Sequence, residues 1–389
     1  METRKYYYED SHRTEMTATV LSCEEGKKGF EVVLSGTVFF PEGGGQSADT
    51  GVFYISEEET VSVLDVHERN GIIYHTTDQP VEPGTELRGE IDWNERFSKM
   101  QNHSGEHLVS GIIHRLFQYN NVGFHLGSTD VTIDFDGPLT REQLNQVEQM
   151  ANEAVFLNLP VLEEFPDREH LATMEYRSKT EISGQVRIVT IPGYDCCACC
   201  GVHTAATGEV GLIKLFSAVG FRGGTRMELA CGRRALDMLN LAFGQNTQVS
   251  QAFSAKWTET GTAAAKMNEA LAAEKYRAIG LQRRLIAGIA QRYDNCGNVV
   301  HFEPGLDAGL LRELADAIAQ RCGGIAAVFS GDDRTGYGFC ILARTGDLRP
   351  LGKAMTQSLS GRGGGRADAQ QGRVNASRAQ IETFFANWN

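Results

Sequence analysis

The 389-residue sequence contains no apolar run near the roughly 20 residues that a membrane-spanning helix needs. Its first residues also lack the apolar core of a secretory signal. Positive charge is scarce, because 37 Lys and Arg stand against 50 Asp and Glu, a formal net charge of −13. These features argue against a membrane protein and against a protein that coats nucleic acid indiscriminately, but they allow local basic patches. We therefore expect a soluble, cytoplasmic protein.

The cysteines are odd in number and unevenly placed. Four of the nine lie at Cys196, Cys197, Cys199 and Cys200. Adjacent cysteines are awkward to bridge, so reduced thiols and a metal are favoured over disulfides. Hydrophobic residues at 41% and charged residues at 22% are ordinary values for a globular protein.

Four segments are predicted, and together they give an α+β fold. Residues 1–91 contain short β-branched stretches separated by Gly, Pro and Asn turns, which predicts a small β-barrel. Residues 92–240 alternate helix and strand patterns and are expected to form an α+β domain, with a helix capped by Asp92. Residues 241–294 are rich in Ala, Glu, Lys and Leu, which predicts a helical linker, with Gly261 and Gly280 as its weak points. Residues 295–389 predict a C-terminal α/β domain.

Two histidines on the first predicted helix are the most informative residues. His103 and His107 are four apart, so both side chains leave the same face and can reach one zinc ion. The pair alone is equally compatible with two histidines on a partly exposed helix. The spacing is not the H-E-x-x-H pattern of metallopeptidases, because Glu106 points about 100° away around the helix.

The cysteine cluster supplies the second half of a candidate metal site. Cys199 and His203 form a C-x-x-x-H pair, which with the two helical histidines gives nitrogen and sulfur ligands for zinc. Overlapping C-x-x-C pairs, Cys196 with Cys199 and Cys197 with Cys200, also allow a redox pair or half of a zinc knuckle. No second C-x-x-C is present to complete a four-cysteine site, so a catalytic zinc is favoured over a structural one.

Taken together, the motifs resemble those of free-standing alanyl-tRNA editing proteins of the AlaX type, in their long form. Residues 37–51 (TVFFPEGGGQSADTG), 102–108 (NHSGEHL) and 199–211 (CCGVHTAATGEVG) are similar to three motifs of that family. Residues 361–366 (GRGGGR) resemble a glycine-rich motif in the C-terminal domain of alanyl-tRNA synthetase. The resemblance covers essentially the whole chain, and nothing in the chain resembles the synthetase's aminoacylation domain.

The resemblance implies a zinc-dependent hydrolase with His103, His107, Cys199 and His203 as metal ligands. Its substrate would be tRNA(Ala) mischarged with serine, and glycine is an open second choice. The enzyme would cleave the aminoacyl ester without charging tRNA itself. Where the family often has Cys-Gly-Gly-Thr-His, this chain has Cys-Cys-Gly-Val-His, and counting back four residues from His203 selects Cys199 as the thiol ligand.

Selectivity for serine requires a partner for its hydroxyl, because the smaller alanine cannot be excluded by size. His125, Ser128 and Thr129 follow the histidine helix closely and are the candidates, while Ser128 and Thr129 are equally compatible with turn capping. Thr37 and Gln46 are next in line.

Two glycine-rich stretches complete the predicted substrate site. Gln46 is expected to approach the catalytic histidines, and Gly44 and Gly45 would let the tRNA end come close to the backbone. Arg362 and Arg366 in the C-terminal domain are expected to contact RNA phosphates. The same domain or the helix before it could serve self-association, so a homodimer is kept as a hypothesis.

Two other classes of function compete with the hydrolase. A non-catalytic tRNA-binding protein with a structural zinc is the main alternative. A metallopeptidase is disfavoured by the position of Glu106.

Overall fold

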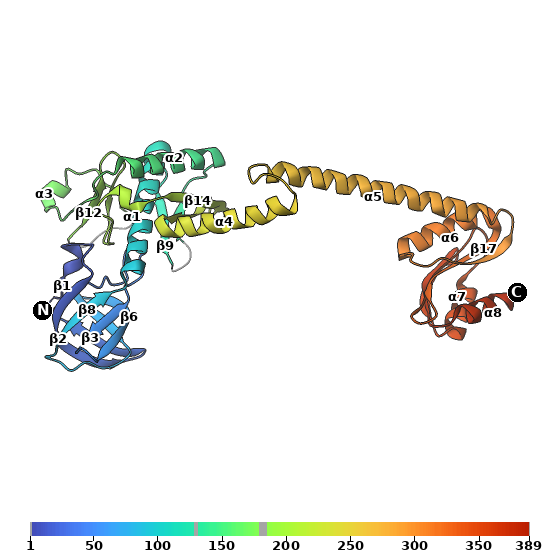
Figure 1. Ribbon diagram of the computed structural model, residues 1–389, viewed down its shortest axis with the longest axis horizontal. Helices are drawn as coiled ribbons and strands as arrows, with labels where there is room; N and C mark the ends of the chain where they lie inside the picture. Colours follow the sequence, from blue (N-terminus) through green and yellow to red (C-terminus); the bar gives the residue numbers. More distant parts are fainter. Residues whose placement is uncertain (1, 128–130, 179–184, 389) are drawn as a thin grey trace. The chain divides into compact units, whose positions relative to one another are not determined.

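The computed structural model describes residues 2–127, 131–178 and 185–388. The chain packs as two compact units, residues 1–248 and 249–389 (Figure 1). In the described part of the chain, no helix has both the length and the apolarity to cross a bilayer. The four segments predicted from the sequence have other boundaries than these two units, and they remain a prediction.

The first unit begins with a closed barrel of six strands in the order β2-β3-β7-β6-β5-β8, which confirms the predicted small β-barrel. Side chains such as Val20, Phe39, Phe53 and Ile73 fill its interior. The elements of this region are β1 (Arg4–Lys5), η1 (Tyr6–Tyr8), β2 (Glu15–Gly26), β3 (Gly29–Leu34), β4 (Gly36–Thr37), β5 (Gly51–Tyr54), β6 (Thr60–Arg69), β7 (Ile72–Thr77) and β8 (Glu86–Ile91).

Helix α1 (Trp93–Phe117) leads from the barrel into the second part of the unit (Figure 1). It begins as predicted, because the side chain of Asp92 accepts a hydrogen bond from the Glu95 N–H. Helix α2 (Arg141–Leu157) starts at a capping box formed by Thr140 and Gln143, a Thr-x-x-Gln pattern that the sequence itself displays.

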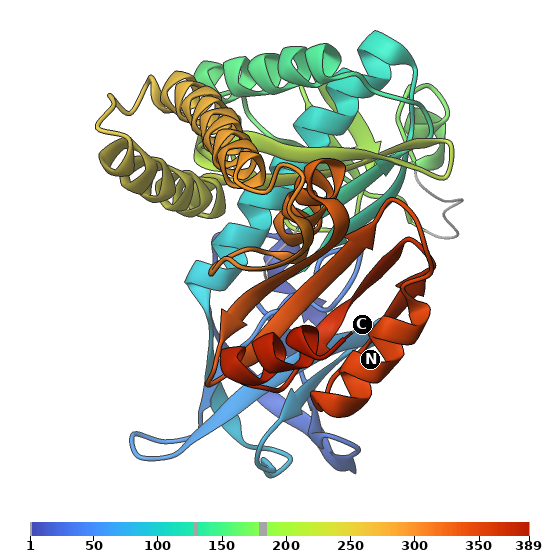
Figure 2. The ribbon, with the colours of Figure 1, turned by 90° about the vertical axis from the view of Figure 1, so that its right-hand side faces the viewer.

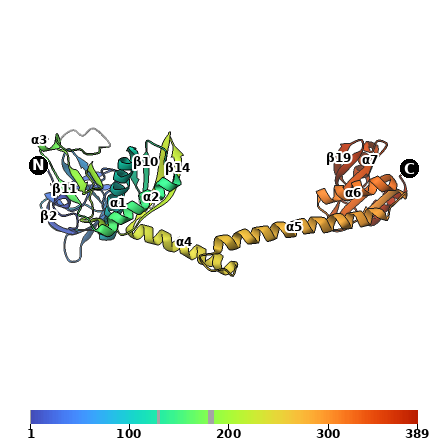
Figure 3. The same ribbon diagram turned by 90° about the horizontal axis from the view of Figure 1, so that it is seen from above.

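Helices α1 and α2 pack against a four-stranded antiparallel sheet in the order β14-β15-β10-β9 (Figure 3). Its strands are β9 (Asn121–Leu126), β10 (Val131–Phe135), β14 (Ile213–Phe221) and β15 (Gly224–Cys231). A smaller antiparallel sheet has the order β11-β12-β13. It contains β11 (Leu162–Glu164), β12 (Ile188–Ile191) and β13 (Asp195–Ala198). The short helix α3 (Arg168–Leu171) lies between β11 and β12 in sequence, and the short helix η2 (Thr207–Val210) follows β13. The mixed α+β character predicted for this region is confirmed.

Two helices follow in sequence, α4 (Gly232–Ala252) and α5 (Thr260–Gln291). The prediction of a helical region is confirmed, but only one of the two glycines predicted to interrupt it lies at a helix end. Gly261 lies at the start of α5, whereas α5 runs through Gly280 without a break. A single glycine costs a helix only about 1 kcal/mol relative to alanine, which the other residues of a long helix can offset.

The second unit is built around a five-stranded sheet in the order β16-β17-β18-β20-β19, with only β16 and β17 parallel. Helix α6 and the end of α5 cover one face, and α7 and α8 cover the other (Figure 2). The elements are β16 (Gly297–Phe302), α6 (Ala308–Cys322), β17 (Gly323–Asp332), β18 (Gly336–Ala343), α7 (Arg349–Ser358), β19 (Arg362–Arg366), β20 (Ala369–Val374) and α8 (Arg378–Ala386).

Candidate metal centre

Four predicted ligands from two distant segments meet in the first unit. His103 and His107 lie on consecutive turns of α1, and Cys199 and His203 lie in the loop that follows β13. Their potential ligand atoms all lie within 4.8 Å of one another. The three histidines are buried and Cys199 is partly exposed.

Hydrogen bonds from outside the cluster fix two of the rings. Nδ1 of His103 lies 2.8 Å from Oε1 of Gln46, and Nδ1 of His107 lies 2.9 Å from Oδ2 of Asp195. A glutamine oxygen and an ionised carboxylate only accept, so both Nδ1 atoms carry the proton. Once a metal ion displaces any proton from Nε2, each Nε2 presents its lone pair to that ion.

The imidazole of His203 is the third histidine ring of the cluster. Nδ1 of His203 lies 3.3 Å from the hydroxyl of Ser104. Nε2 of His203 is buried without a hydrogen-bond partner among the described residues. A buried nitrogen that lacks a partner is costly, which indicates that a ligand belongs at this point.

The charges of the cluster suit a metal ion. Burial raises the pKa of the Cys199 thiol, but the neighbouring His103 and His203 outweigh it and hold this pKa well below its ordinary value of 9.0. Burial lowers the pKa of His203 to about 3, so its imidazole is neutral. Burial lowers the pKa of His107, but its hydrogen bonds with Asp195 and Cys199 outweigh burial and raise this pKa to about 10, so a metal ion must displace a proton from this ring. A thiolate and imidazole nitrogens are donors that Zn²⁺ prefers, so the four residues fit zinc.

Asp195 is the buried carboxylate of the centre. Burial would raise its pKa, but hydrogen bonds from His107 and Arg177 outweigh burial and lower the pKa from its ordinary value of 3.8. Asp195 is therefore ionised, as a carboxylate that orients a metal-bound histidine must be.

Glu106 lies outside the set of four, in agreement with its predicted angle on the helix. It does not face solvent, however. Its Oε1 accepts hydrogen bonds from Ser110 Oγ at 2.6 Å and from Asn121 Nδ2 at 2.5 Å, and its Oε2 lies 4.0 Å from Nε2 of His107. The carboxylate is therefore part of the buried surroundings of the centre.

The glycine-rich segment of the barrel reaches the centre through a tight turn. Gly44 and Gly45 have positive φ values of 62° and 84°. A side chain on Gly45 would begin 2.7 Å from a ring carbon of Phe124. The turn therefore needs glycine both for its backbone conformation and for its approach to β9.

Helix α1 also anchors this segment. Arg96 forms a fully buried ion pair with Asp49, and Nζ of Lys99 donates to the carbonyl of Ala48. The helix that carries His103 thus also holds the segment that supplies Gln46.

A cavity of about 550 Å³ opens beside the metal centre. Gly44, Gly45, His107 and Cys199 line it, and all four were predicted site residues. Its other lining residues include Lys5, Tyr8, Phe124, Phe165, Gln185 and Arg187. An apolar and cationic wall next to the ligand cluster can accept a substrate with an aromatic and a negatively charged part.

Curated proteins with similar sequences are named for alanyl-tRNA editing. The Xenopus laevis "Alanyl-tRNA editing protein Aarsd1-A" is 29% identical over 400 residues, covering 97% of this chain and 95% of that protein. The Mus musculus "Alanyl-tRNA editing protein Aarsd1" is 28% identical, covering 97% of this chain and 96% of that protein. This chain is related to the alanyl-tRNA editing proteins. The predicted resemblance is confirmed.

Two family models match parts of this chain. "tRNA synthetases class II (A)" matches residues 3–95, and "Threonyl and Alanyl tRNA synthetase second additional domain" matches residues 186–226. The second match contains Cys199 and His203, and both histidines of α1 lie between the two matches. The "Alanine--tRNA ligase" of Halobacterium salinarum is 33% identical over 364 residues, 85% of this chain but 38% of the ligase. The C-Ala domain of Aquifex aeolicus alanyl-tRNA synthetase aligns with 24% of this chain at 23% identity, with a TM-score of 0.21 that supports no inference.

Of the other predicted substrate residues, His125 and Thr37 do not line this cavity. His125 is exposed on β9, and the neighbouring Phe124 is the one that contacts the His103 ring, at 5.1 Å between centroids. Ser128 and Thr129 lie outside the described residues. The hydroxyl of Thr37 lies 2.8 Å from Nε2 of His75 in the barrel. Arg362 and Arg366 lie on the exposed strand β19 of the second unit.

Sequence reasoning missed several residues that shape the centre. Asp195 and Ser104 orient two histidines, and Gly201 allows close packing, since a side chain there would begin 2.1 Å from Cε1 of His103. Arg187 holds the ligand loop by donating to the carbonyls of Cys199 and Gly201 at 3.0 and 2.7 Å. One signal was available for Asp195, because a histidine that binds metal usually has a carboxylate or carbonyl behind it.

Proposed function

We propose that this protein is a zinc-dependent hydrolase that removes serine from mischarged tRNA(Ala). The observation that carries the proposal is the buried set of four ligand atoms beside an open cavity. Similarity to alanyl-tRNA editing proteins over 97% of the chain supports the choice of substrate. Glycine is a second candidate for the amino acid that is removed.

Zinc would be held by His103, His107, Cys199 and His203. Bound there, it would act as a Lewis acid that polarises an ester carbonyl and favours ionisation of water. The protein's own part is to hold each imidazole ring in the orientation that directs its Nε2 to the metal. Gln46, Asp195 and Ser104 do so through hydrogen bonds to the three Nδ1 atoms.

We assign serine recognition to the amide of Gln46. Its Oε1 accepts from His103, while its Nε2 is buried without a hydrogen-bond partner among the described residues. Gln46 is fully buried, and its neighbours Gly44 and Gly45 line the cavity. We propose that the bound substrate reaches this donor past the two glycines through its seryl hydroxyl or ester carbonyl, and alanine would leave the donor without a partner. A hydrogen bond contributes about 0.5–1.5 kcal/mol and a stranded polar group costs about 1–3 kcal/mol. These values support roughly 10- to 1,000-fold selectivity for serine.

The test is deacylation of tRNA(Ala) charged with serine, glycine or alanine by the zinc-loaded protein. We expect kcat/KM for seryl-tRNA(Ala) to exceed that for alanyl-tRNA(Ala) by the factor given above. A His103→Ala, His107→Ala variant, which lacks two ligands, is the control for contaminating hydrolases. Equal rates for the native protein and this variant would refute the proposal.

A second candidate function is tRNA binding without catalysis. Four protein ligands are typical of structural zinc sites, whereas catalytic sites keep a position open for water or substrate. The cavity that exposes part of Cys199 favours catalysis. A protein that binds tRNA(Ala) and zinc normally, but hydrolyses none of the three esters, would support the second candidate.

We further propose that the second unit docks tRNA. Strand β19 carries Arg362 and Arg366 around three glycines, and all five residues are exposed. Arginines separated by glycine can approach phosphates closely. Exposed apolar side chains on α5, such as Leu271 and Leu281, keep a homodimer as a hypothesis.

A further inference from the structure

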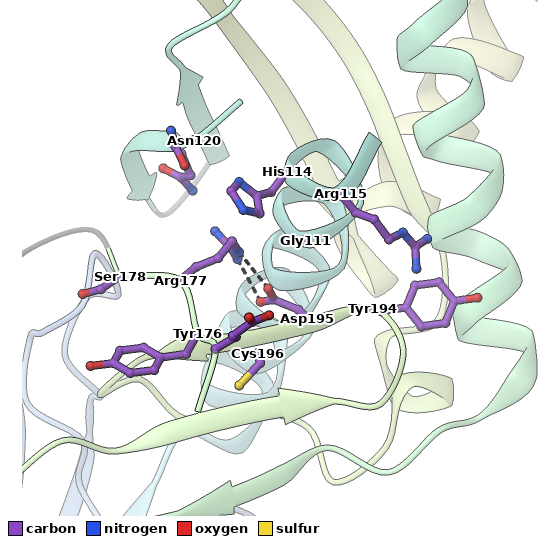
Figure 4. Close-up of a pocket in the computed structure, with 12 residues that line it drawn as sticks. Gly111, His114, Arg115, Asn120, Tyr176, Arg177, Ser178, Tyr194, Asp195 and Cys196 are labelled. Carbon is purple, nitrogen blue, oxygen red and sulfur yellow. Dashed lines mark hydrogen bonds and ion pairs between the residues drawn. The ribbon is translucent and has the colours of Figure 1, made fainter. Parts of the chain in front are cut away.

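Arg177 forms a two-pronged ion pair behind the metal centre. Its Nε lies 2.7 Å from Oδ1 of Asp195, and its second guanidinium nitrogen lies 2.8 Å from Oδ2 (Figure 4). The same Oδ2 accepts the hydrogen bond from Nδ1 of His107. A continuous chain of contacts therefore links Arg177, Asp195 and His107.

The backbone of Arg177 is fixed on the strand that leads to Cys199. Its N–H donates to the carbonyl of Cys196 at 2.8 Å, and its carbonyl accepts from the N–H of Ala198 at 2.9 Å. Through these two hydrogen bonds, Arg177 lies alongside β13 and forms an isolated parallel β-bridge with Cys197. The guanidinium thus starts from a fixed point relative to Asp195.

Helix α1 comes close to Asp195 because residue 111 is glycine. A side chain there would begin 2.4 Å from the carbonyl oxygen of Tyr194 and 2.8 Å from Cβ of Asp195. Gly111 lies four residues after His107, directly along the same face of the helix. Close packing at Gly111 therefore brings the carboxylate within reach of the ring.

The pair is buried unevenly. The side chain of Asp195 is 2% exposed and that of Arg177 is 13% exposed, at the wall of a second cavity of about 440 Å³ that His114 and Tyr194 also line. A carboxylate this deeply buried needs a charged partner, and two parallel hydrogen bonds also set its orientation. His107 by itself offers only one hydrogen bond and leaves Asp195 free to turn.

We propose that Arg177 is a positioning residue of the metal centre, which locks the Asp195 carboxylate so that it holds His107 in the orientation for metal binding. Arg177 acts only through Asp195 and contacts none of the four ligands' metal-facing atoms. The proposal rests on the proposed function for its activity readout alone, because metal affinity tests it independently.

The experiment measures zinc affinity of the full chain by competition with a chromophoric chelator. Removing a partner of this kind typically lowers metal affinity 10- to 100-fold. We expect Arg177→Gln to lower zinc affinity about 10-fold and Arg177→Lys to lower it less, since lysine keeps the charge but not the two-pronged geometry. The matched control is Arg226→Lys, which breaks an equally short two-pronged pair with Asp134 in the same unit and should leave zinc affinity unchanged.

A double variant decides whether Arg177 acts through Asp195. In an Asp195→Asn background, Arg177→Gln should cause no further loss of affinity, because the group it positions is already altered. If either glutamine variant fails to fold, as judged by thermal unfolding, Arg177→Lys is compared in the two backgrounds instead. An equal loss in both backgrounds, or no loss in the native background, would overturn the proposal.

Two further readouts separate positioning from substrate binding. The absorption bands of the cobalt-substituted protein should shift in Arg177→Gln, and kcat for seryl-tRNA(Ala) should fall while KM stays constant. A KM that rises with salt while zinc affinity and the cobalt spectrum stay unchanged would mean that Arg177 binds a substrate phosphate, and the proposal would be wrong. If the zinc affinities change as expected but the native protein deacylates none of the charged tRNAs, the proposed function would be wrong, while Arg177 would still be a positioning residue of the metal centre.

Discussion

Oε1 of Gln46 lies 2.8 Å from Nδ1 of His103, which joins the glycine-rich segment of the barrel to the helix of the metal centre. The two polar atoms of the Gln46 amide therefore differ in their contacts. The oxygen accepts a hydrogen bond that orients His103, whereas the nitrogen has no hydrogen-bond partner among the described residues. The two ends can be tested separately.

Gln46→Glu keeps an acceptor for His103 but loses the amide N–H. We expect this variant to retain zinc affinity and to lose most of its preference for seryl- over alanyl-tRNA(Ala). Gln46→Ala loses both ends, so zinc affinity should also fall, by about 10- to 100-fold. Chelator competition and kcat/KM ratios measure the two effects. An unchanged serine-to-alanine ratio in Gln46→Glu would move the discriminating group elsewhere.

Neighbouring cysteines provide a test of the ligand register. Cys199 belongs to the cluster of four ligands, whereas Cys200 is exposed and lies outside it. Cys199→Ala should abolish deacylation and lower bound zinc, and Cys200→Ala should have a mild effect. Metal content and the deacylation rate measured on the same samples check this. Dependence on Cys200 instead would show that the register is wrong.

Glycine at position 201 is required by the packing around His103. A side chain there would begin 2.1 Å from Cε1 and 2.4 Å from Nδ1 of the ring, so Gly201→Ala must displace His103 or the ligand loop. We expect zinc affinity to drop at least 10-fold. Gly220→Ala is the matched control, because, apart from the chain neighbours of Gly220, no heavy atom of the described residues lies within 4 Å of the added carbon. Similar zinc affinity in both variants would contradict the packing argument.

Acid should destabilise the barrel through His75. Burial lowers the pKa of this residue from 6.5 to about 4, and its Nδ1 hydrogen bond to the Val32 carbonyl only partly opposes the change. The unfolded chain therefore takes up a proton below pH 6.5 that the folded chain refuses. The stabilisation is complete above pH 6.5 and is lost as the pH falls toward 4, by roughly 3 kcal/mol in all.

Urea unfolding at several pH values measures this effect. Between pH 6.5 and 4, His75→Gln should reduce the slope of the unfolding free energy against pH by about one proton. His170→Gln, at an exposed position, serves as the control. If the unfolding free energy of His75→Gln depends on pH as steeply as that of the native protein, groups other than His75 cause the acid sensitivity.

The C-terminal unit should contribute binding that depends on salt. Deleting residues 295–389 should weaken tRNA binding while bound zinc persists. Replacing Arg362 and Arg366 together by alanine should reduce the slope of log affinity against log salt by about 2, if each contacts one phosphate. Arg277→Ala, Arg283→Ala on α5 is the charge-matched control. An unchanged affinity and slope in the truncated protein would refute docking by this unit.

Local features of the fold followed from the sequence, because they depend on neighbouring residues. Asp92 and Thr140 cap helices through hydrogen bonds that span three residues, and the four-residue spacing of His103 and His107 places them on one face of a helix. Alternating β-branched stretches likewise predicted the barrel. The union of these histidines with Cys199 and His203 was inferred from residue types and then supported by the family resemblance, since nearly 100 residues separate the pairs and no local spacing links them.

Tertiary structure alone decided which groups support the ligands. Asp195, Arg177 and Gly201 reach the histidines only because β13 packs against α1, and no spacing in the sequence encodes that approach. The same holds for His125, whose place in the chain suggested a substrate contact but which the alternation of β9 leaves exposed while Phe124 meets His103. Residue type and local spacing thus determined the donors of the site. The orientation of the ligand side chains, and the residues that hydrogen-bond to them, depended on long-range packing, in which each contact is set by many residues at once.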